Sequence, residues 1–380
     1  MIIILLYIFS FLFISFILRE KKYFRAQEII CFMGLFIFFG FRDLPVLNDT
    51  GHYYEEYLYV ASDKSYLNSS VFSIDIFQRF EPGFQLFEKT IAKFISQDPY
   101  SIIIISSLIS SIVLLYLIKF FTHKLALTIF FLLGTSLIFY FYNNIRQGFA
   151  CYLFWLGILQ FIKKNRNVKI VKIKWTLLFA LLCILAVAFH YSAIVLFAPI
   201  LLSRLSLNKK NVCLIIAIGL LFCFSTYYLM RITGLSEVDY YDRGLNRETA
   251  SFGPLLNAII QIILAYVSFH LTKKYNIAVV HPIIWWVIIL ACIFSAASVL
   301  NGIIGRFAMY FSIFTIVNFV CCLERTPAHY RHIIKNVLVV VLFLRVYILL
   351  EYRPEWNHLY PYSFYDFSKP YHEYRIYDEN

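Results

Sequence analysis

Charged residues are scarce in this sequence, and their scarcity excludes most classes of protein. Only 15% of the 380 residues are Asp, Glu, Lys or Arg, whereas 61% are hydrophobic. A soluble domain has about 25% charged and about 45–50% apolar residues. The composition therefore excludes a soluble enzyme, a disordered chain and a secreted disulfide scaffold. The mean hydropathy of +0.72 indicates a helical membrane protein instead.

Motifs for nucleotides, metals and redox chemistry are missing as well. The sequence contains no CxxC, HExxH, GxGxxG or Walker loop, and these are the short patterns that report such sites. It also lacks a DxD carboxylate pair, which metal-dependent sugar transfer often uses. We therefore expect no metal, no cofactor and no ATP-driven pump.

Long apolar runs occupy most of the chain. A hydrocarbon core of about 30 Å needs roughly 20 residues per crossing. We predict an all-α polytopic membrane protein with about 12 transmembrane helices, formed by a single integral membrane domain over residues 1–350. The predicted spans are residues 2–18, 28–41, 101–118, 125–142, 147–162, 175–189, 191–203, 212–230, 252–271, 282–300, 307–323 and 334–350.

Basic residues set the predicted orientation. Four of them follow the first apolar run and none precedes it, so we place the N-terminus outside. Alternation then puts 20 of the 34 Lys and Arg residues in six cytoplasmic loops, which explains the net charge of +12 without a nucleic-acid partner. Residues 175–203 could form one helix, but this would put the later basic loops outside. We therefore favour two short segments that turn near His190.

Acidic residues gather on the opposite side. On this topology 19 of the 22 Asp and Glu residues lie in the outer loop 42–100, the outer loop 231–251 or the hydrophilic tail 351–380. Such acids form a solvated surface or take part in polar chemistry there. Within loop 42–100, aromatic residues recur at helical spacing and predict short amphipathic helices on the outer surface. Tyr53 and Tyr57, beside carboxylates, suit the binding of sugar rings.

Two lone arginines on the outer side are candidates for anion binding. Arg146 and Arg306 each lie beside glycine at a predicted helix end. The guanidinium fork matches phosphate oxygens, although a snorkelling arginine at a helix end is the alternative. Arg243 and Arg247 lie in an outer loop rich in acids. They either form ion pairs within that loop or close over a charged substrate.

Three further residues are candidates for proton transfer. His190 follows a mostly apolar run, so it is either a structural residue at a helix end or a base for a sugar hydroxyl. Glu81 precedes Pro82 and is either a first-turn helix acid or a base. Asp49 is either a helix cap or an acceptor for a hydroxyl.

Five motifs in order resemble the EpsG-like branch of Wzy-type polysaccharide polymerases, over roughly residues 40–320. We assign sugar contacts within them to Tyr53, Tyr57, Asn143, Gln147 and Tyr310. The motifs are Asp49 with Tyr53 and Tyr57, Glu81-Pro82-Gly83-Phe84, Asn143-Asn144-Ile145-Arg146-Gln147, Phe189-His190-Tyr191-Ser192-Ala193, and Gly305-Arg306 with Tyr310-Phe311.

The resemblance implies a glycosyltransferase of GT-C-like architecture that is independent of metal. It would polymerise lipid-linked repeat units of O-antigen, or of a capsule or exopolysaccharide, at the periplasmic face of the bacterial inner membrane. The implied partners are polyprenyl-diphosphate-linked glycans, membrane lipids and a protein that sets chain length. Arginines would stabilise the diphosphate leaving group, and a base would activate the acceptor hydroxyl.

Two other functions fit a polytopic protein with basic inner loops. A flippase of lipid-linked saccharides should show internal repeats and polar residues within the spans, and Arg345 is the main ionisable residue there. A membrane O-acetyltransferase of glycans would also need a histidine, together with an acyl-donor site that no motif here indicates.

Overall fold

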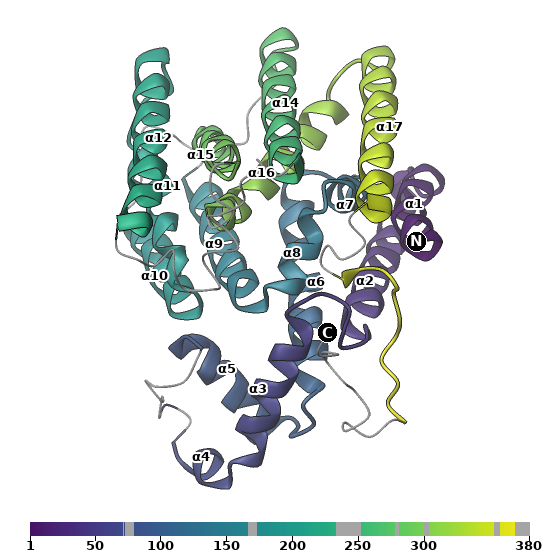
Figure 1. Cartoon of the computed structure of the whole chain (residues 1–380). Helices are drawn as coiled ribbons and strands as arrows, with labels where there is room; N and C mark the ends of the chain where they lie inside the picture. The colour runs from purple at the N-terminus through teal and green to yellow at the C-terminus, as the bar shows by residue number, and fades with distance from the viewer. Residues whose placement is uncertain are drawn as a thin grey trace. The chain divides into compact units, whose positions relative to one another are not determined.

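The computed structural model is all-helical over the residues it describes, which are 1–70, 72, 80–165, 173–232, 252–277, 281–299, 304–352 and 358–368. The chain divides into two compact units. Unit 1 comprises residues 1–152, 185–191 and 337–380, and unit 2 comprises residues 153–184 and 192–336. Figure 1 shows the helices of both units, and each unit is described here by itself.

Every predicted span coincides with helical structure. Seven helices are long and apolar enough to cross a membrane, and a bent pair, α7 and α8, adds an eighth if counted as one span. This confirms a multi-pass helical membrane protein, whereas the count of about 12 crossings stays a prediction. The elements at the predicted spans are α1 (Ile2–Ile17), α2 (Phe24–Gly40), α6 (Ser101–Phe121), α7 (Leu125–Gly134), α8 (Leu137–Asn143), α9 (Ile145–Lys164), α10 (Ile173–Phe189), η2 (Tyr191–Phe197), α11 (Ala198–Leu202), α12 (Lys209–Ile232), α14 (Phe252–Lys274), α15 (Ile283–Ala297), α16 (Gly305–Glu324) and α17 (Ala328–Tyr352).

Three short helices lie between α2 and α6, as the aromatic spacing predicts. They are α3 (Thr50–Ser62), α4 (Lys64–Asn68) and α5 (Pro82–Phe94), and a one-turn helix η1 (Lys21–Tyr23) precedes α2. The helices α3 and α5 pack against each other in unit 1. The Tyr57 hydroxyl donates to the Ser96 carbonyl at 2.6 Å, which ties α3 to the segment after α5.

An arginine from α17 stabilises the break between α7 and α8. These helices meet at 82°, and Ser136 at the bend has φ of 61°, a conformation that L-residues seldom adopt. Arg345 donates from Nη1 to the Gly134 carbonyl at 2.8 Å and to Ser136 Oγ at 2.7 Å. The carbonyl freed by the break is thus satisfied, which explains an arginine within an apolar helix.

The tail after α17 contacts the start of the region between α2 and α6. Asp43 N donates to the Ser363 carbonyl at 3.0 Å, and Tyr365 N donates to the Phe41 carbonyl at 2.9 Å. The Tyr365 ring stacks on Tyr100 with centroids 3.9 Å apart. The two segments therefore lie on one side of unit 1, and the membrane side they face stays a prediction.

The helix ending at Phe189 and the helix starting at Tyr191 are separate, so the predicted break at His190 is present. In unit 2, Ser192 Oγ and the Tyr310 hydroxyl are hydrogen-bonded at 2.8 Å. Trp155 Nε1 donates to the Tyr310 carbonyl at 3.4 Å. These contacts link η2 and the middle of α9 to α16. Helix α16 is the most buried of the candidate spans.

Candidate active site

Two residues that are distant in sequence converge on the carboxylate of a third in unit 1. Glu81 Oε1 lies 2.8 Å from His190 Nδ1, and Glu81 Oε2 accepts a hydrogen bond from Arg146 Nη1. The contacts join positions 109 and 65 residues apart. Glu81 thus links the imidazole of His190 to the guanidinium of Arg146.

Each member of this cluster lies at a helix end. Glu81 occupies the N-cap position of α5, with Pro82 at the first position of the helix. Arg146 is the second residue of α9, and His190 directly follows the last residue of α10. Because the proline ring fixes φ of Pro82 at a helical value, α5 begins directly after the extended backbone of Glu81.

Gly83 permits the close approach of α5 to α10. A Cβ atom at Gly83 would lie 2.8 Å from the Ala188 carbonyl oxygen and 2.9 Å from its carbon. Both are backbone atoms, so the clash could be relieved only by moving a helix. Gly83 therefore allows Glu81 to reach His190, two residues after Ala188.

Aromatic rings hold the three helices in register. Phe149 of α9 lies 4.5 Å from Phe87 of α5 and 5.5 Å from Phe189 of α10, between ring centroids. Gly148 plays a second spacing role, because a Cβ atom there would lie 2.8 Å from the Phe141 carbonyl oxygen. Gly148 therefore permits the close approach of α9 to the backbone of α8.

Arg146 makes several contacts and keeps donor capacity. Its guanidinium carbon lies 4.3 Å from the centre of the Phe80 ring, a cation–π contact. Its backbone N–H donates to the Tyr53 hydroxyl at 3.5 Å. Its Nε is buried without a hydrogen-bond partner. Since guanidinium has five N–H donors, Arg146 can bind an anion while it keeps Glu81.

The three side chains of the cluster differ in how far they are exposed. The Glu81 side chain is 6% exposed, whereas that of His190 is 13% and that of Arg146 is 24% exposed. The imidazole and the guanidinium therefore keep some exposed surface, whereas the Glu81 carboxylate is almost fully covered. Burial alone would raise the pKa of Glu81, but the hydrogen bond with His190 and the charges of Arg146 and His190 lower it below its ordinary value.

Asp49 and Asn143 connect α3 to the break before α9. Asp49 N donates to Asn143 Oδ1 at 3.0 Å. Asp49 occupies the N-cap position of α3, yet its side chain makes no capping hydrogen bond. The predicted alternative of a side-chain cap is therefore absent, and its role as a hydroxyl acceptor stays a prediction.

A buried arginine that the sequence did not single out lies near these residues. Arg42 donates from Nε to Thr50 Oγ1 at 2.9 Å and from Nη2 to the Tyr142 carbonyl at 3.0 Å. It is fully buried, and it ties α3 to the end of α8. Its position directly after the apolar run 28–41 was the available signal.

All five residues assigned to sugar contacts are buried in this conformation. Tyr53, Tyr57, Asn143, Gln147 and Tyr310 all belong to the buried core of their units. Tyr57 and Tyr310 have no exposed surface and use their hydroxyls within the protein. The rings of Tyr57 and Tyr310 cannot stack on a sugar without rearrangement, and the five assigned sugar contacts stay predictions.

The other predicted anion-binding residues do not belong to the described part of unit 1. Arg306 is the second residue of α16 in unit 2, and its juxtaposition with Arg146 stays a prediction. Arg243 and Arg247 lie outside the described residues.

A second acid on α5 is also buried. Glu88 is 1% exposed, and neither of its carboxyl oxygens has a hydrogen-bond partner. Burial raises its pKa well above the ordinary value; the charge of Glu56 adds to this and that of Arg146 opposes it. Burial therefore favours the neutral form of the Glu88 carboxyl group, seven positions after Glu81.

Comparison with known proteins assigns the family. The family model for the EpsG family matches residues 26–364. The chain belongs to the EpsG family. EpsG-like proteins include Wzy-type polysaccharide polymerases, and the match reaches into the tail, beyond residues 40–320. No curated protein and no solved structure matches significantly.

Proposed function

We propose that this EpsG-family protein polymerises lipid-linked oligosaccharide repeat units at the outer face of the bacterial inner membrane. The growing glycan on a polyprenyl diphosphate is the donor, and a new lipid-linked unit supplies the acceptor hydroxyl. The observation that carries this proposal is the convergence of His190 and Arg146 on Glu81. O-antigen is the favoured product among surface polysaccharides.

His190 is the proposed base. An ionised carboxylate can only accept hydrogen bonds, so the proton between Glu81 and His190 is assigned to Nδ1 of the imidazole. The Nε2 lone pair is then available for the proton of the acceptor hydroxyl. A carboxylate that orients an imidazole in this way also stabilises the imidazolium that forms, and such general bases contribute about 10²–10⁴-fold in rate.

Arg146 is the proposed ligand of the donor diphosphate. The acceptor oxygen forms a bond to the anomeric carbon of the donor's reducing-end sugar, the carbon–oxygen bond to the diphosphate breaks, and the electron pair leaves with the diphosphate. A guanidinium beside that oxygen stabilises the developing charge without a metal. We propose that Arg306 binds the second phosphate, and that Arg243 and Arg247 close over the substrate.

The polysaccharide made by a deletion strain tests this function. Loss of a polymerase should leave lipid A capped by one repeat unit, and the wild-type gene should restore the ladder of chain lengths. Loss of a flippase would leave no repeat unit outside, and loss of an acetyltransferase would leave full-length chains without acetyl groups. Either of the last two patterns would contradict the proposal.

A further inference from the structure

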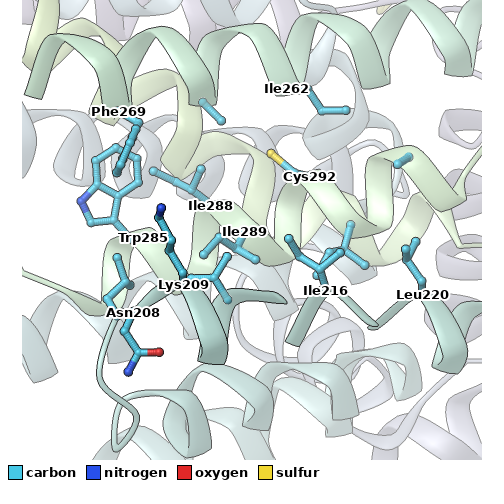
Figure 2. A pocket seen from close by; sticks show the side chains of 15 residues that line it. Asn208, Lys209, Ile216, Leu220, Ile262, Phe269, Trp285, Ile288, Ile289 and Cys292 are labelled. Atoms are coloured by element: carbon cyan, nitrogen blue, oxygen red, sulfur yellow. The ribbon is translucent and has the colours of Figure 1, made fainter. Parts of the chain in front are cut away.

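Unit 2 contains an apolar groove between three membrane helices. Its cavity volume is about 520 Å³. The lining residues come from α12, α14, α15 and the segment before α12, and α15 packs against both α12 and α14. The groove is thus walled by α12 and α14, with α15 between them (Figure 2).

The groove has one polar end. Its lining is apolar along Ile216, Leu220 and Ile293, whereas Asn208 and Lys209 line the end beside Trp285. Figure 2 shows Lys209 next to Trp285 at one end and Leu220 at the other. Such a surface suits an amphiphile, with its chain along the apolar helices and its head group at Lys209.

Positive charge concentrates at this end. Lys209 and Lys210 begin α12, and Lys273 and Lys274 end α14. Phe269 of the groove lies 5.9 Å from Lys273 Nζ, measured to the ring centre, which puts the end of α14 beside it. In the part of the chain that the structure describes, Lys209 and Lys210 form no ion pair. The sequence contains no Asp or Glu between Asp98 and Glu237, so no acid close in sequence neutralises these two lysines. The head group that complements this end is anionic.

The rest of the protein leaves the outer wall of the groove largely uncovered. In the apolar part of α12, Lys209–Thr226, only 6% of the residues are buried inside the protein. The Lys-rich end is predicted to face the cytoplasm, where anionic phospholipids gather and basic pockets between membrane helices bind their head groups. A donor diphosphate at the outer face belongs to the other leaflet.

We propose that this groove binds an anionic phospholipid of the cytoplasmic leaflet, with an acyl chain between α12 and α14 and its phosphate at Lys209 and Lys210. The lipid covers the face of α15 that α12 and α14 leave open. The proposal does not depend on the polymerase activity, because it rests on residues of unit 2 alone.

Native mass spectrometry of the full-length protein tests it. The detergent-purified protein should retain phosphatidylglycerol more strongly than phosphatidylethanolamine. Each basic residue near an anionic lipid surface is worth about fivefold in affinity, so Lys209→Ala/Lys210→Ala should weaken phosphatidylglycerol binding about thirtyfold. The matched control is Lys163→Ala/Lys164→Ala, which removes the same charge from the end of α9 and should bind as the wild type does.

Filling the groove is the second arm. Ile289→Trp on α15 or Ala265→Trp on α14 should abolish the lipid adduct. One of these variants is sufficient for the test, provided that it elutes as one species. Equal loss in the two double-lysine variants would overturn the proposal. So would wild-type binding in a filled groove, equal retention of the two phospholipids, or displacement of phosphatidylglycerol by an equimolar polyprenyl phosphate.

Discussion

Glu81 has both carboxylate oxygens engaged, one by an imidazole and one by a guanidinium. Removing its charge therefore affects two functional groups at once. Because its pKa is lowered, the carboxylate is ionised above the ordinary range for glutamate. Its contribution to stability is present above the unfolded pKa and is lost as the pH falls through the lower, folded value. The cluster should stay intact throughout the neutral range.

Substitution of Arg146 can separate the effect of its positive charge from the effect of its hydrogen-bonding geometry. Arg146→Lys keeps the charge but loses the planar fork that contacts Glu81 and leaves further donors for an anion. A charge-assisted contact is worth about 1.5–3 kcal/mol, so we expect polymer formation to fall roughly ten- to a hundredfold, with Arg146→Ala lower still. Chain-length ladders at matched protein levels measure this. Arg19→Lys, an exposed arginine on the first loop, is the control.

A snorkelling anchor at position 146 would behave differently. Lysine would then substitute freely, and alanine would mainly reduce the amount of protein in the membrane. Normal ladders from Arg146→Lys would thus remove the diphosphate assignment.

Glu88 should reverse the usual effect of an acid on stability. Its folded pKa is raised, so the folded state binds more protons than the unfolded state above about pH 4.3, the ordinary glutamate value. The free energy of unfolding should therefore decrease as the pH rises from there through the folded pKa. Glu88→Gln mimics the neutral acid and should flatten this dependence, measured as melting temperature in detergent from pH 4 to pH 8. Parallel profiles for Glu88→Gln and the wild type, with Glu55→Gln as an exposed control, would show that Glu88 is not the source.

Three helix ends build the site at the scale of elements, and the spacing between α5 and α10 depends on Gly83. Gly83→Ala must move backbone, because the new methyl group would meet the Ala188 carbonyl. We expect a cost of about 1–3 kcal/mol, as for overpacking, and a loss of polymer larger than the loss of folded protein. Thermal unfolding and the chain-length ladder measure the two effects.

A matched glycine provides the control for this substitution. At Gly253 of α14 a Cβ atom would meet nothing within 4 Å. Gly253→Ala should therefore be neutral or stabilise the protein by about 0.5–1 kcal/mol. Equal behaviour of the two variants would show that the approach of α5 to α10 is not needed.

The sequence predicts elements better than contacts. Apolar runs located the helices, and the polar His190-Tyr191-Ser192 stretch located a break, because both signals are local. Glu81, Arg146 and His190 were each recognised as candidates, but with separate roles. Their pairing joins residues 65 and 109 positions apart, and one sequence carries no signal for such contacts. The burial of Glu88 and Tyr57 depends on how α3 packs on α5 and was equally invisible.

At the scale of the whole molecule, orientation in the membrane is the main open prediction. In a Cys213→Ser background, which removes an exposed native thiol, Lys64→Cys should react with an impermeant maleimide in intact spheroplasts. Lys209→Cys should react only after permeabilisation, because its loop is predicted to be cytoplasmic. Labelling of residue 209 in intact spheroplasts would reverse the orientation downstream of His190.

The most direct measurement is polymerisation by purified protein in proteoliposomes supplied with a polyprenyl-diphosphate-linked repeat unit. We predict that the wild type and Glu55→Gln form a ladder of chain lengths. Glu81→Gln should slow it by about 10²-fold or more, since both the base and the anion ligand lose their support. A ladder from Glu81→Gln at the wild-type rate, at equal protein, would contradict the site. The absence of any ladder from folded wild type would contradict the proposed polymerase.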